Sequence, residues 1–211
     1  MNEVRLYLDY TCPWSYLALV RLRDVADRNG AQISLRPVVA DKILATENPA
    51  LQASRLDPNP AKAAWQQKDL QDWARMWGLQ LNLPANWPVD ASLAAAGGVT
   101  ANKNDHGIEY SLNVYRACFA NGEDISSAAV LTRCAVDAGL SESEFNSALA
   151  HTEAQQQVAV WNDELIRLGG FGTPSMVVED ELFFGNDRMP LVDWRLSPLG
   201  SGEFVAPGQH G

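Results

Sequence analysis

The first forty residues alternate between strand-like and helix-like hydrophobic patterns. Residues 4–10 (VRLYLDY) are mostly apolar and rich in strand formers, which predicts a largely buried strand. In residues 16–29 the apolar side chains recur at helical spacing, and Gly30 ends the predicted helix. Residues 32–39 alternate again and predict a second strand. A strand, a helix and a strand in succession favour a right-handed crossover, so we expect the two strands to be parallel.

A long loop and then a series of helices are predicted for the middle of the chain. Residues 40–60 contain three prolines and several small polar residues, which favours a loop with at most one short helix. Residues 61–78 have a strong helical pattern, and residues 81–88 are too rich in proline for an interior strand and predict a shaped loop. The helix at 61–78 is expected to bury one aromatic and apolar face, formed by Trp65, Leu70, Trp73, Ala74 and Trp77.

Residues 91–168 are predicted to be helical, with helix starts at Ser126-Ser127 and, in a capping-box spacing, at Ser141. Interruptions are expected near Gly97-Gly98, Asn121-Gly122 and Gly139. Strands return at 175–178 and 181–184, joined by a hairpin turn, and a final helix is predicted at 189–196.

This order of elements is that of an α/β protein with a thioredoxin-like βαβ…ββα fold and a large all-helical insertion. The Gly-rich polar end of the chain predicts a disordered tail. The expected parts are a first thioredoxin-like segment at 1–40, a mostly helical insertion domain at 41–168, a second thioredoxin-like segment at 169–197 and the tail at 198–211.

Composition narrows the possible partners and the compartment. The 211 residues carry 16 Lys and Arg against 26 Asp and Glu, and a formal charge of -10 repels nucleic acid and anionic lipid. The start lacks the basic flank and apolar run of a signal peptide, and no run of about eighteen apolar residues occurs, so we predict a soluble cytoplasmic protein without a membrane partner. Three cysteines and three histidines, without ligand spacing, predict neither a disulfide framework nor a metal site.

Cys12 is the strongest candidate for chemistry. It ends the first predicted strand and directly precedes a helix, whose exposed N–H groups favour a thiolate. The alternative is a semi-buried cysteine without a chemical role. Because Ser15 stands where a dithiol enzyme has its second cysteine, a mixed disulfide at Cys12 would need an external thiol for release. Cys118 and Cys134 fall on predicted helices and are expected in the core.

Four motifs occur in an order that resembles the DsbA-like thioredoxin superfamily. They are residues 9–18 (DYTCPWSYLA), the helix at 62–78, the loop at 83–86 (LPAN), and the pair 171–174 (FGTP) with 184–188 (FGNDR). Together they span about residues 4–196 and resemble in particular the branch of 2-hydroxychromene-2-carboxylate isomerases and kappa-class glutathione transferases.

The resemblance implies glutathione as cofactor, a small aromatic substrate and a homodimer. It implies glutathione binding by Cys12, Thr173, Pro174, Asn186 and Asp187, with weaker carboxylate contacts from Ser15, Lys62 and Asn86. A cis peptide before Pro174 would leave the Thr173 backbone free to pair with a peptide-like ligand. Asn186 and Asp187 could bind the γ-glutamyl end of glutathione, or simply cap a helix.

One residue departs from the resemblance, because the family's isomerases and kappa transferases generally carry serine at the position of Cys12. A thiol is a poorer hydrogen-bond donor than a hydroxyl, and a thiolate donates no hydrogen bond. Cys12 thus favours an oxidoreductase, but the whole-chain similarity favours the isomerase branch, and the first hypothesis is a glutathione-dependent isomerase of an aromatic pyruvate-type substrate. The alternatives are a monothiol thiol–disulfide oxidoreductase that uses Cys12, a kappa-class-like glutathione transferase, and a glutathione- or peptide-binding protein without catalysis.

Overall fold

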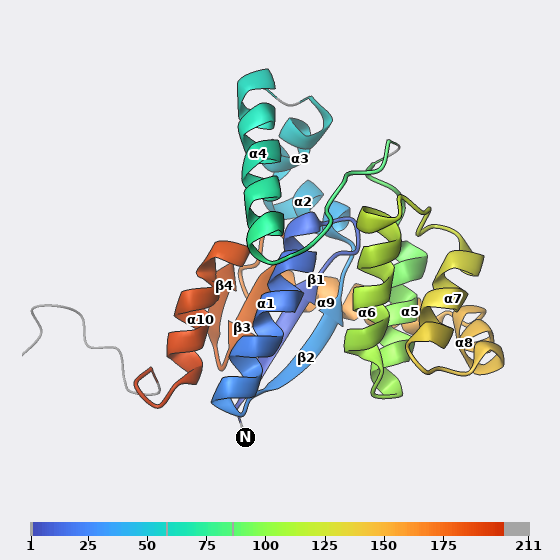
Figure 1. Ribbon diagram of the computed structural model, residues 1–211. Coiled ribbons are helices and arrows are strands. Elements are labelled where there is room, and N and C mark those ends of the chain that lie inside the picture. The colour runs from blue at the N-terminus through green and yellow to red at the C-terminus, as the bar shows by residue number, and fades with distance from the viewer. Residues whose placement is uncertain (1, 58, 86, 201–211) are drawn as a thin grey trace, which may run out of the picture.

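A mixed four-stranded sheet lies at the centre of the protein (Figure 1). The computed structural model describes residues 2–57, 59–85 and 87–200. The strands are β1 (Glu3–Leu8), β2 (Gln32–Pro37), β3 (Ser175–Val178) and β4 (Glu181–Phe184), in the order β2-β1-β3-β4. β1 pairs with β2 in parallel, as predicted, whereas β3 pairs antiparallel with β1 and with β4. The thioredoxin-like arrangement is confirmed.

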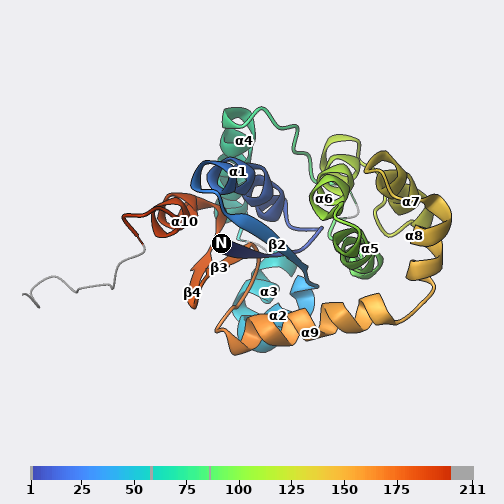
Figure 2. The same ribbon diagram turned by 90° about the horizontal axis from the view of Figure 1, so that it is seen from below.

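Helices cover both faces of this sheet. Figure 2 shows α1 (Pro13–Asn29) and α10 (Met189–Leu196) on one side, and α9 (Glu153–Arg167) with α2 (Ala40–Glu47) on the other. The remaining helices are α3 (Pro49–Leu56), α4 (Pro60–Met76), α5 (Ser92–Lys103), α6 (Gly107–Tyr115), the π-helical η1 (Arg116–Ala120), α7 (Ala128–Asp137), α8 (Glu142–Leu149) and the 3-10 turn η2 (Asn186–Arg188). None of the helices within the described residues is long and apolar enough to cross a membrane.

The hydrophobic core continues from the sheet into the helical part. Fully buried side chains such as Leu6 of β1, Phe119 of η1 and Phe145 of α8 belong to one cluster. Helix α5 packs on both β2 and α9, so it joins the sheet to the helices beside it. The domain boundaries at residues 40 and 168 stay a prediction, and the predicted tail lies outside the described residues from position 201 onward.

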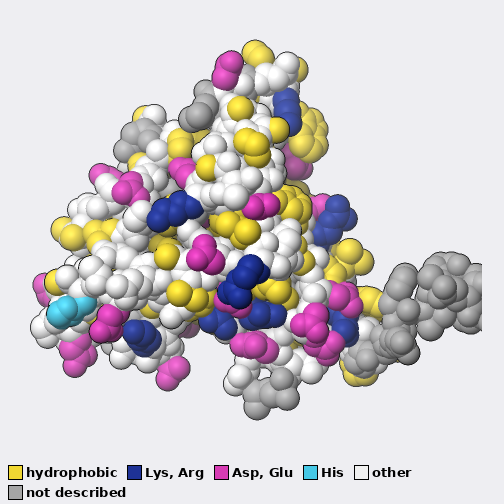
Figure 3. Space-filling view, turned by 180° about the vertical axis from the view of Figure 1, so that it is seen from behind, with side chains coloured by type: hydrophobic (Ala, Val, Ile, Leu, Met, Phe, Trp, Pro, Cys, Tyr) yellow, Lys and Arg dark blue, Asp and Glu magenta, His cyan; other side chains and the backbone are white. Residues whose placement is uncertain are grey.

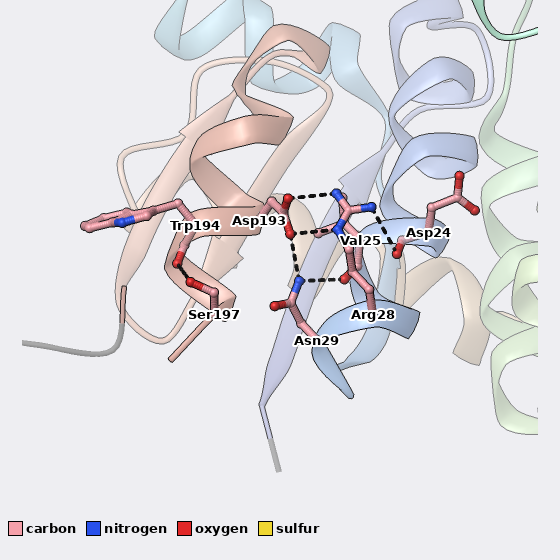
Figure 4. Close-up of polar contacts among 7 residues, drawn as sticks. All are labelled: Asp24, Val25, Arg28, Asn29, Asp193, Trp194 and Ser197. Carbon is pink, nitrogen blue, oxygen red and sulfur yellow. Dashed lines mark hydrogen bonds and ion pairs between the residues drawn. The ribbon is translucent and has the colours of Figure 1, made fainter. Parts of the chain in front are cut away.

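A polar cluster connects the ends of α1 and α10 (Figure 4). The Asp193 carboxylate accepts hydrogen bonds from Arg28 Nε at 3.0 Å, Arg28 Nη2 at 2.7 Å and Asn29 Nδ2 at 2.8 Å. Because Arg28 is largely exposed, solvent screens this pair and its contribution to stability is small. The cluster therefore orients α10 against α1 more than it stabilises the fold.

The predicted loop at 40–60 is wrong, since this stretch forms two helices, α2 and α3. Its prolines begin helices instead of interrupting them. Pro49 occupies the first turn of α3, where no N–H is needed, and the Asn48 side chain accepts a hydrogen bond from Leu51 N at 3.2 Å. Pro60 likewise begins α4 after the capping residue Asn59.

The predicted break at Gly97-Gly98 is also wrong, because α5 runs through both glycines. A Cβ atom at Gly97 would lie 2.1 Å from the Tyr110 hydroxyl oxygen, and one at Gly98 would lie 2.3 Å from that of Tyr10. The glycines thus allow close packing of two buried tyrosines. The interruptions near Asn121-Gly122 and Gly139 are confirmed.

The predicted helix starts at Ser127 and Ser141 are confirmed in position. Neither side chain makes a capping hydrogen bond to its helix, although the spacing predicted one. The Ser141 hydroxyl instead lies 3.1 Å from the Ser143 hydroxyl.

The aromatic face predicted for α4 is correct only in part. Leu70 and Ala74 are buried, whereas the side chain of Trp65 is 62% exposed. Leu70 is five positions after Trp65, which places the two side chains about 140° apart around the helix axis. Trp65 therefore cannot share the buried face.

Candidate active site

The candidate site is built on the turn between β1 and α1. Cys12 is the N-cap of α1, and Pro13 occupies the first helical position. The Cys12 N–H donates to Asp9 O at 3.0 Å, and the Ser15 and Tyr16 N–H groups donate to Cys12 O at 3.0 and 3.3 Å. The thiol is therefore held at the start of a helix by a fully hydrogen-bonded turn.

A buried carboxylate, which the sequence analysis did not single out as a site residue, organises this turn. Asp9 is 2% exposed, and its Oδ1 accepts hydrogen bonds of 2.6 Å from both the N–H and the hydroxyl of Thr11. Its Oδ2 accepts one from Ala40 N at 2.6 Å, and its backbone oxygen accepts one from the Tyr115 hydroxyl at 3.0 Å. The signal for this role was an Asp two residues before a Thr, the spacing of a local side-chain turn.

Thr173 and Pro174 lie against the thiol. The peptide bond between them is cis, as the resemblance implied. The Cys12 thiol donates to the Thr173 carbonyl oxygen at 3.3 Å, so this carbonyl is already engaged. The Thr173 N–H has no hydrogen-bond partner among the described residues and remains available to a peptide-like ligand.

The ionisation of Cys12 differs from the prediction. Burial is the largest influence and raises the pKa of the Cys12 thiol above its ordinary value, while hydrogen bonds with Ser15 and Thr173 oppose it more weakly. The helix N-terminus alone had predicted a thiolate. Burial also raises the pKa of Cys118 to about 12 and that of Cys134 to about 11, and both lie in the core as predicted.

A pocket of about 410 Å³ opens beside Cys12. Its apolar walls are Ala40, Leu44, Leu51, Ala63, Leu70 and Leu83, with the aromatic side chains of Trp14 and Trp87. Its polar lining comes from Cys12, Ser54, Gln66, Gln67 and Thr173. No charged side chain lines it within the described part of the chain, which suits a flat apolar guest.

Asn186 and Asp187 lie outside the lining of this pocket. Asn186 is 3% exposed, and Arg21 Nη1 donates to its backbone oxygen at 2.6 Å and to its Oδ1 at 2.9 Å. The Arg21 guanidinium also lies over the rings of Trp73 and Trp77, at 4.8 and 5.4 Å from their centroids. Asn186 is thus tied to Arg21, whereas Asp187 is exposed at the start of η2.

The remaining predicted residues are placed as follows. Ser15 is fully buried beneath the turn, and its Oγ accepts a long hydrogen bond of 3.5 Å from Asp9 N. Lys62 is exposed in the first turn of α4, next to the pocket residue Ala63 but outside the lining. Asn86 lies outside the described residues. No group of three metal-ligating side chains occurs among the residues that the structure describes.

Fold and site together define a DsbA-like member of the thioredoxin class. The family model of the DSBA-like thioredoxin domain matches residues 3–197, so the chain belongs to this family. A relative from Sphingobium xenophagum, named 2-hydroxychromene-2-carboxylate isomerase, is 28% identical over 193 residues, which cover 91% of this chain and 96% of the relative.

Solved structures agree with the fold. A 2-hydroxychromene-2-carboxylate isomerase superposes with a TM-score of 0.78 at 24% identity, covering 90% of this chain and 92% of its own. A probable DsbA oxidoreductase from Streptomyces coelicolor superposes with a TM-score of 0.80 at 18% identity, covering 97% of this chain and 92% of its own. The two structures share one fold but carry different named activities.

Proposed function

We propose that the protein is a glutathione-dependent isomerase that acts on an aromatic pyruvate-type substrate, as the name of its relatives suggests. The observation that carries this proposal is the state of Cys12. The thiol donates a hydrogen bond to Thr173 O at 3.3 Å, and burial raises its pKa, so the side chain can donate a hydrogen bond to a bound thiolate, as the resemblance implies for the family's serine. Cys12 would orient a bound thiolate and would not itself attack.

Thr173 beside Cys12, and Asp187 outside the pocket lining, offer groups that suit a peptide-like thiol cofactor. The unpartnered Thr173 N–H offers a backbone donor next to the thiol, and the exposed Asp187 carboxylate suits an ammonium group. When bound, glutathione supplies a thiolate that adds reversibly to a conjugated double bond. The weaker candidates Lys62 and Asn86 would contact carboxylates of cofactor or substrate.

The chain itself would position the acceptor and exclude water. Trp14 and Trp87 provide flat aromatic surfaces at the pocket wall, and the Trp87 indole is fixed by a hydrogen bond of 2.7 Å from its Nε1 to Thr11 O. Holding the acceptor beside the thiol site makes the addition of the thiolate effectively unimolecular, which lowers its entropic cost. Because no charged side chain of the described residues lines the pocket, the Cys12 hydrogen bond to the thiolate would also be stronger than in water.

The direct test is isomerisation of 2-hydroxychromene-2-carboxylate, followed by absorbance with and without reduced glutathione. We expect turnover only with glutathione, and S-methylglutathione, which binds without a free thiol, should inhibit. Equal turnover without glutathione, or none under any condition, would contradict the proposal.

A monothiol oxidoreductase is the second candidate, supported by the partial exposure of Cys12 at a helix N-terminus. In that reaction the Cys12 sulfur would attack a disulfide, the old S–S bond would break as the new one forms, and the departing sulfur would take the proton. The raised pKa of Cys12 opposes this reaction. Rapid formation of a single Cys12 adduct with oxidised glutathione, measured by mass, would favour it.

A further inference from the structure

The wall that α4 contributes to the pocket beside Cys12 carries two side-chain amides. Ala63, Gln66, Gln67 and Leu70 line the pocket at the spacing i, i+3, i+4 and i+7, so they share one face of the helix. No side-chain hydrogen bond joins Gln66 or Gln67 to another described residue. Each amide has two N–H donors, so this wall can bind a group that is rich in acceptors.

The lining of the pocket combines exposed polar residues with buried apolar ones. Gln66 and Gln67 are exposed, whereas Ala40, Leu44 and Leu70 are at most 5% exposed. A flat conjugated ring gains most among the buried side chains, because its apolar surface is removed from water there. A carboxylate on the same molecule loses least at the exposed amides, where it keeps part of its hydration and accepts hydrogen bonds. A guest with a ring and a carboxylate therefore fits this pocket in one orientation, with the charged end at α4.

The pocket also has backbone donors at its Cys12 end. The Thr173 N–H has no partner among the described residues, and the N-terminus of α1, with its partial positive charge, begins at the same place. The proposed function assigns this end to glutathione, whose thiolate and peptide backbone use these donors. While the cofactor is bound, the carboxylate of the substrate needs donors elsewhere in the lining, and Gln66 and Gln67 provide them.

Surface charge around α4 is mixed. Lys62 lies one turn before Gln66 on the same side of the helix, but it is exposed and outside the lining. Figure 3 shows hydrophobic side chains on the projecting α3–α4 part of the rear face, and elsewhere on that face basic side chains next to acidic ones. A basic patch that would gather anions toward α4 is not seen on this face among the described residues. Selection of a carboxylate therefore depends on donors in the pocket wall more than on surface charge.

We infer that Gln66 and Gln67 determine substrate specificity by donating hydrogen bonds to the carboxylate of the aromatic pyruvate-type substrate, while its ring lies among the buried apolar side chains. With two N–H donors on each amide, the pair can bind both carboxylate oxygens, or one of them and the neighbouring keto oxygen. The inference rests on the proposed function for the class of substrate, and it adds the residues that select this substrate and the orientation in which it binds.

The test compares two probes that share one conjugated skeleton. Benzylidenepyruvate carries the carboxylate, and benzylideneacetone has a methyl group in its place. Titration calorimetry at pH 7 without glutathione gives both dissociation constants. We expect benzylidenepyruvate to bind at least about tenfold more tightly, because its carboxylate accepts charge-assisted hydrogen bonds and the methyl group accepts none. Equal or tighter binding of benzylideneacetone, or no binding of benzylidenepyruvate at millimolar concentration, would overturn the inference.

Substitutions at the two glutamines identify the residues responsible. Both are exposed, so leucine at either position does not disturb the core. The double variant Gln66→Leu/Gln67→Leu should lower the preference for benzylidenepyruvate by about tenfold, and Gln66→Glu should also lower it, by repulsion of the carboxylate. Gln155→Leu, on the exposed face of α9, is the matched control and should leave the ratio unchanged. If the double variant behaves like this control, the amides do not bind the carboxylate and the inference fails.

Kinetics separate this inference from the proposed function. In the isomerase assay, the double variant should raise the KM for 2-hydroxychromene-2-carboxylate by about tenfold, with kcat and the KM for glutathione nearly unchanged. A raised KM for glutathione alone would place the amides at the cofactor and overturn the inference. A wild type without isomerase activity, but with a probe preference that depends on the glutamines, would support the binding role and count against the proposed function alone, because the binding measurement needs neither glutathione nor turnover.

Discussion

At the residue scale, the chemistry depends on whether Cys12 keeps its proton. The thiol donates to Thr173 O, and burial raises its pKa more than the hydrogen bonds with Ser15 and Thr173 lower it, so the neutral form is favoured by desolvation. The position of this cysteine could be predicted from the local sequence. Its protonation could not, because the groups that bury it are distant in the sequence: Thr173 lies 161 residues away, and Trp87 belongs to the loop at 81–88.

The first prediction concerns alkylation of Cys12. A thiol reacts as thiolate, and a pKa above the ordinary value of about 8.5 leaves less thiolate at pH 7. Iodoacetamide should therefore modify Cys12 more slowly than it modifies free glutathione at pH 7, with a midpoint shifted to higher pH. Peptide mapping by mass gives the rate, and the unfolded protein is the control. A midpoint below that of glutathione would show an activated thiolate.

Asp187 is predicted to act on cofactor affinity alone. Its side chain is exposed, and its pairing with Arg188 at 3.5 Å contributes little to stability. Asp187→Asn should raise the KM for glutathione by about tenfold, the loss of one charge-assisted contact, with kcat and Tm nearly unchanged. Asp180→Asn, in the exposed β3–β4 turn, is the control. An unchanged KM would remove Asp187 from the glutathione site.

At the scale of elements, Arg21 joins three segments that are far apart in the sequence. It lies on α1, donates to Asn186 of η2 and packs over Trp73 and Trp77 of α4. Since Asn186 precedes the proposed cofactor contact Asp187 and α4 lines the pocket, this contact positions both segments relative to α1 and Cys12. The sequence showed the aromatic residues of α4 but could not show that a buried arginine would meet them.

Replacing Arg21 should therefore destabilise the fold. Arg21→Lys loses the paired contacts to Asn186 O and Oδ1 and should lower the free energy of unfolding by about 1–3 kcal/mol. Arg28→Lys, about two turns further along α1, disrupts an exposed pair with Asp193 and should cost less than about 1 kcal/mol (Figure 4). Urea denaturation measures both. An equal loss of unfolding free energy in the two variants would mean that the Arg21 contacts contribute no more than the exposed Arg28 pair.

Because α5 is closely packed, a glycine-to-alanine substitution in it is predicted to lower stability, the opposite of what helix propensity alone predicts. Alanine is normally better than glycine in a helix by about 1 kcal/mol. At Gly98, however, a Cβ would lie 2.3 Å from the Tyr10 hydroxyl and 2.8 Å from Pro37 Cγ. Gly98→Ala should therefore destabilise the protein by about 1–3 kcal/mol in urea denaturation. The control is Lys103→Ala on the same helix, which should leave stability nearly unchanged. If Gly98→Ala stabilised the protein, the close packing of α5 against Tyr10 and Pro37 would be contradicted.

The helical elements also show where local patterns were insufficient. Pro49 and Pro60 favour a loop by local pattern, but each lies in the first turn of a helix behind an asparagine cap. Gly97 predicts a helix break by local pattern, but α5 continues through it, and the absence of a Cβ there makes room for the Tyr110 ring. Proline can interrupt a helix or begin one, and glycine can break a helix or allow close packing within it. Which role applies depends on packing partners that are distant in sequence.

At the scale of the whole molecule, the parallel pairing of β1 with β2, the β3–β4 hairpin and the position of the active turn followed from periodicity and from four short motifs. The arrangement of the pocket did not, because its walls come from α1, α2, α3, α4, the loop at 81–88 and the turn at Gly172. The homodimer and the cytoplasmic location stay predictions. Sedimentation at several protein concentrations would measure the first.

The measurement that tests the account most directly is the glutathione-dependent isomerisation rate of Cys12→Ser beside that of the wild type. If Cys12 only donates a hydrogen bond to the cofactor thiolate, serine is an equal or better donor, and the variant should retain or exceed wild-type kcat with the same dependence on glutathione. Loss of isomerase activity in Cys12→Ser, with folding intact, would show that the Cys12 sulfur itself reacts and would contradict the account.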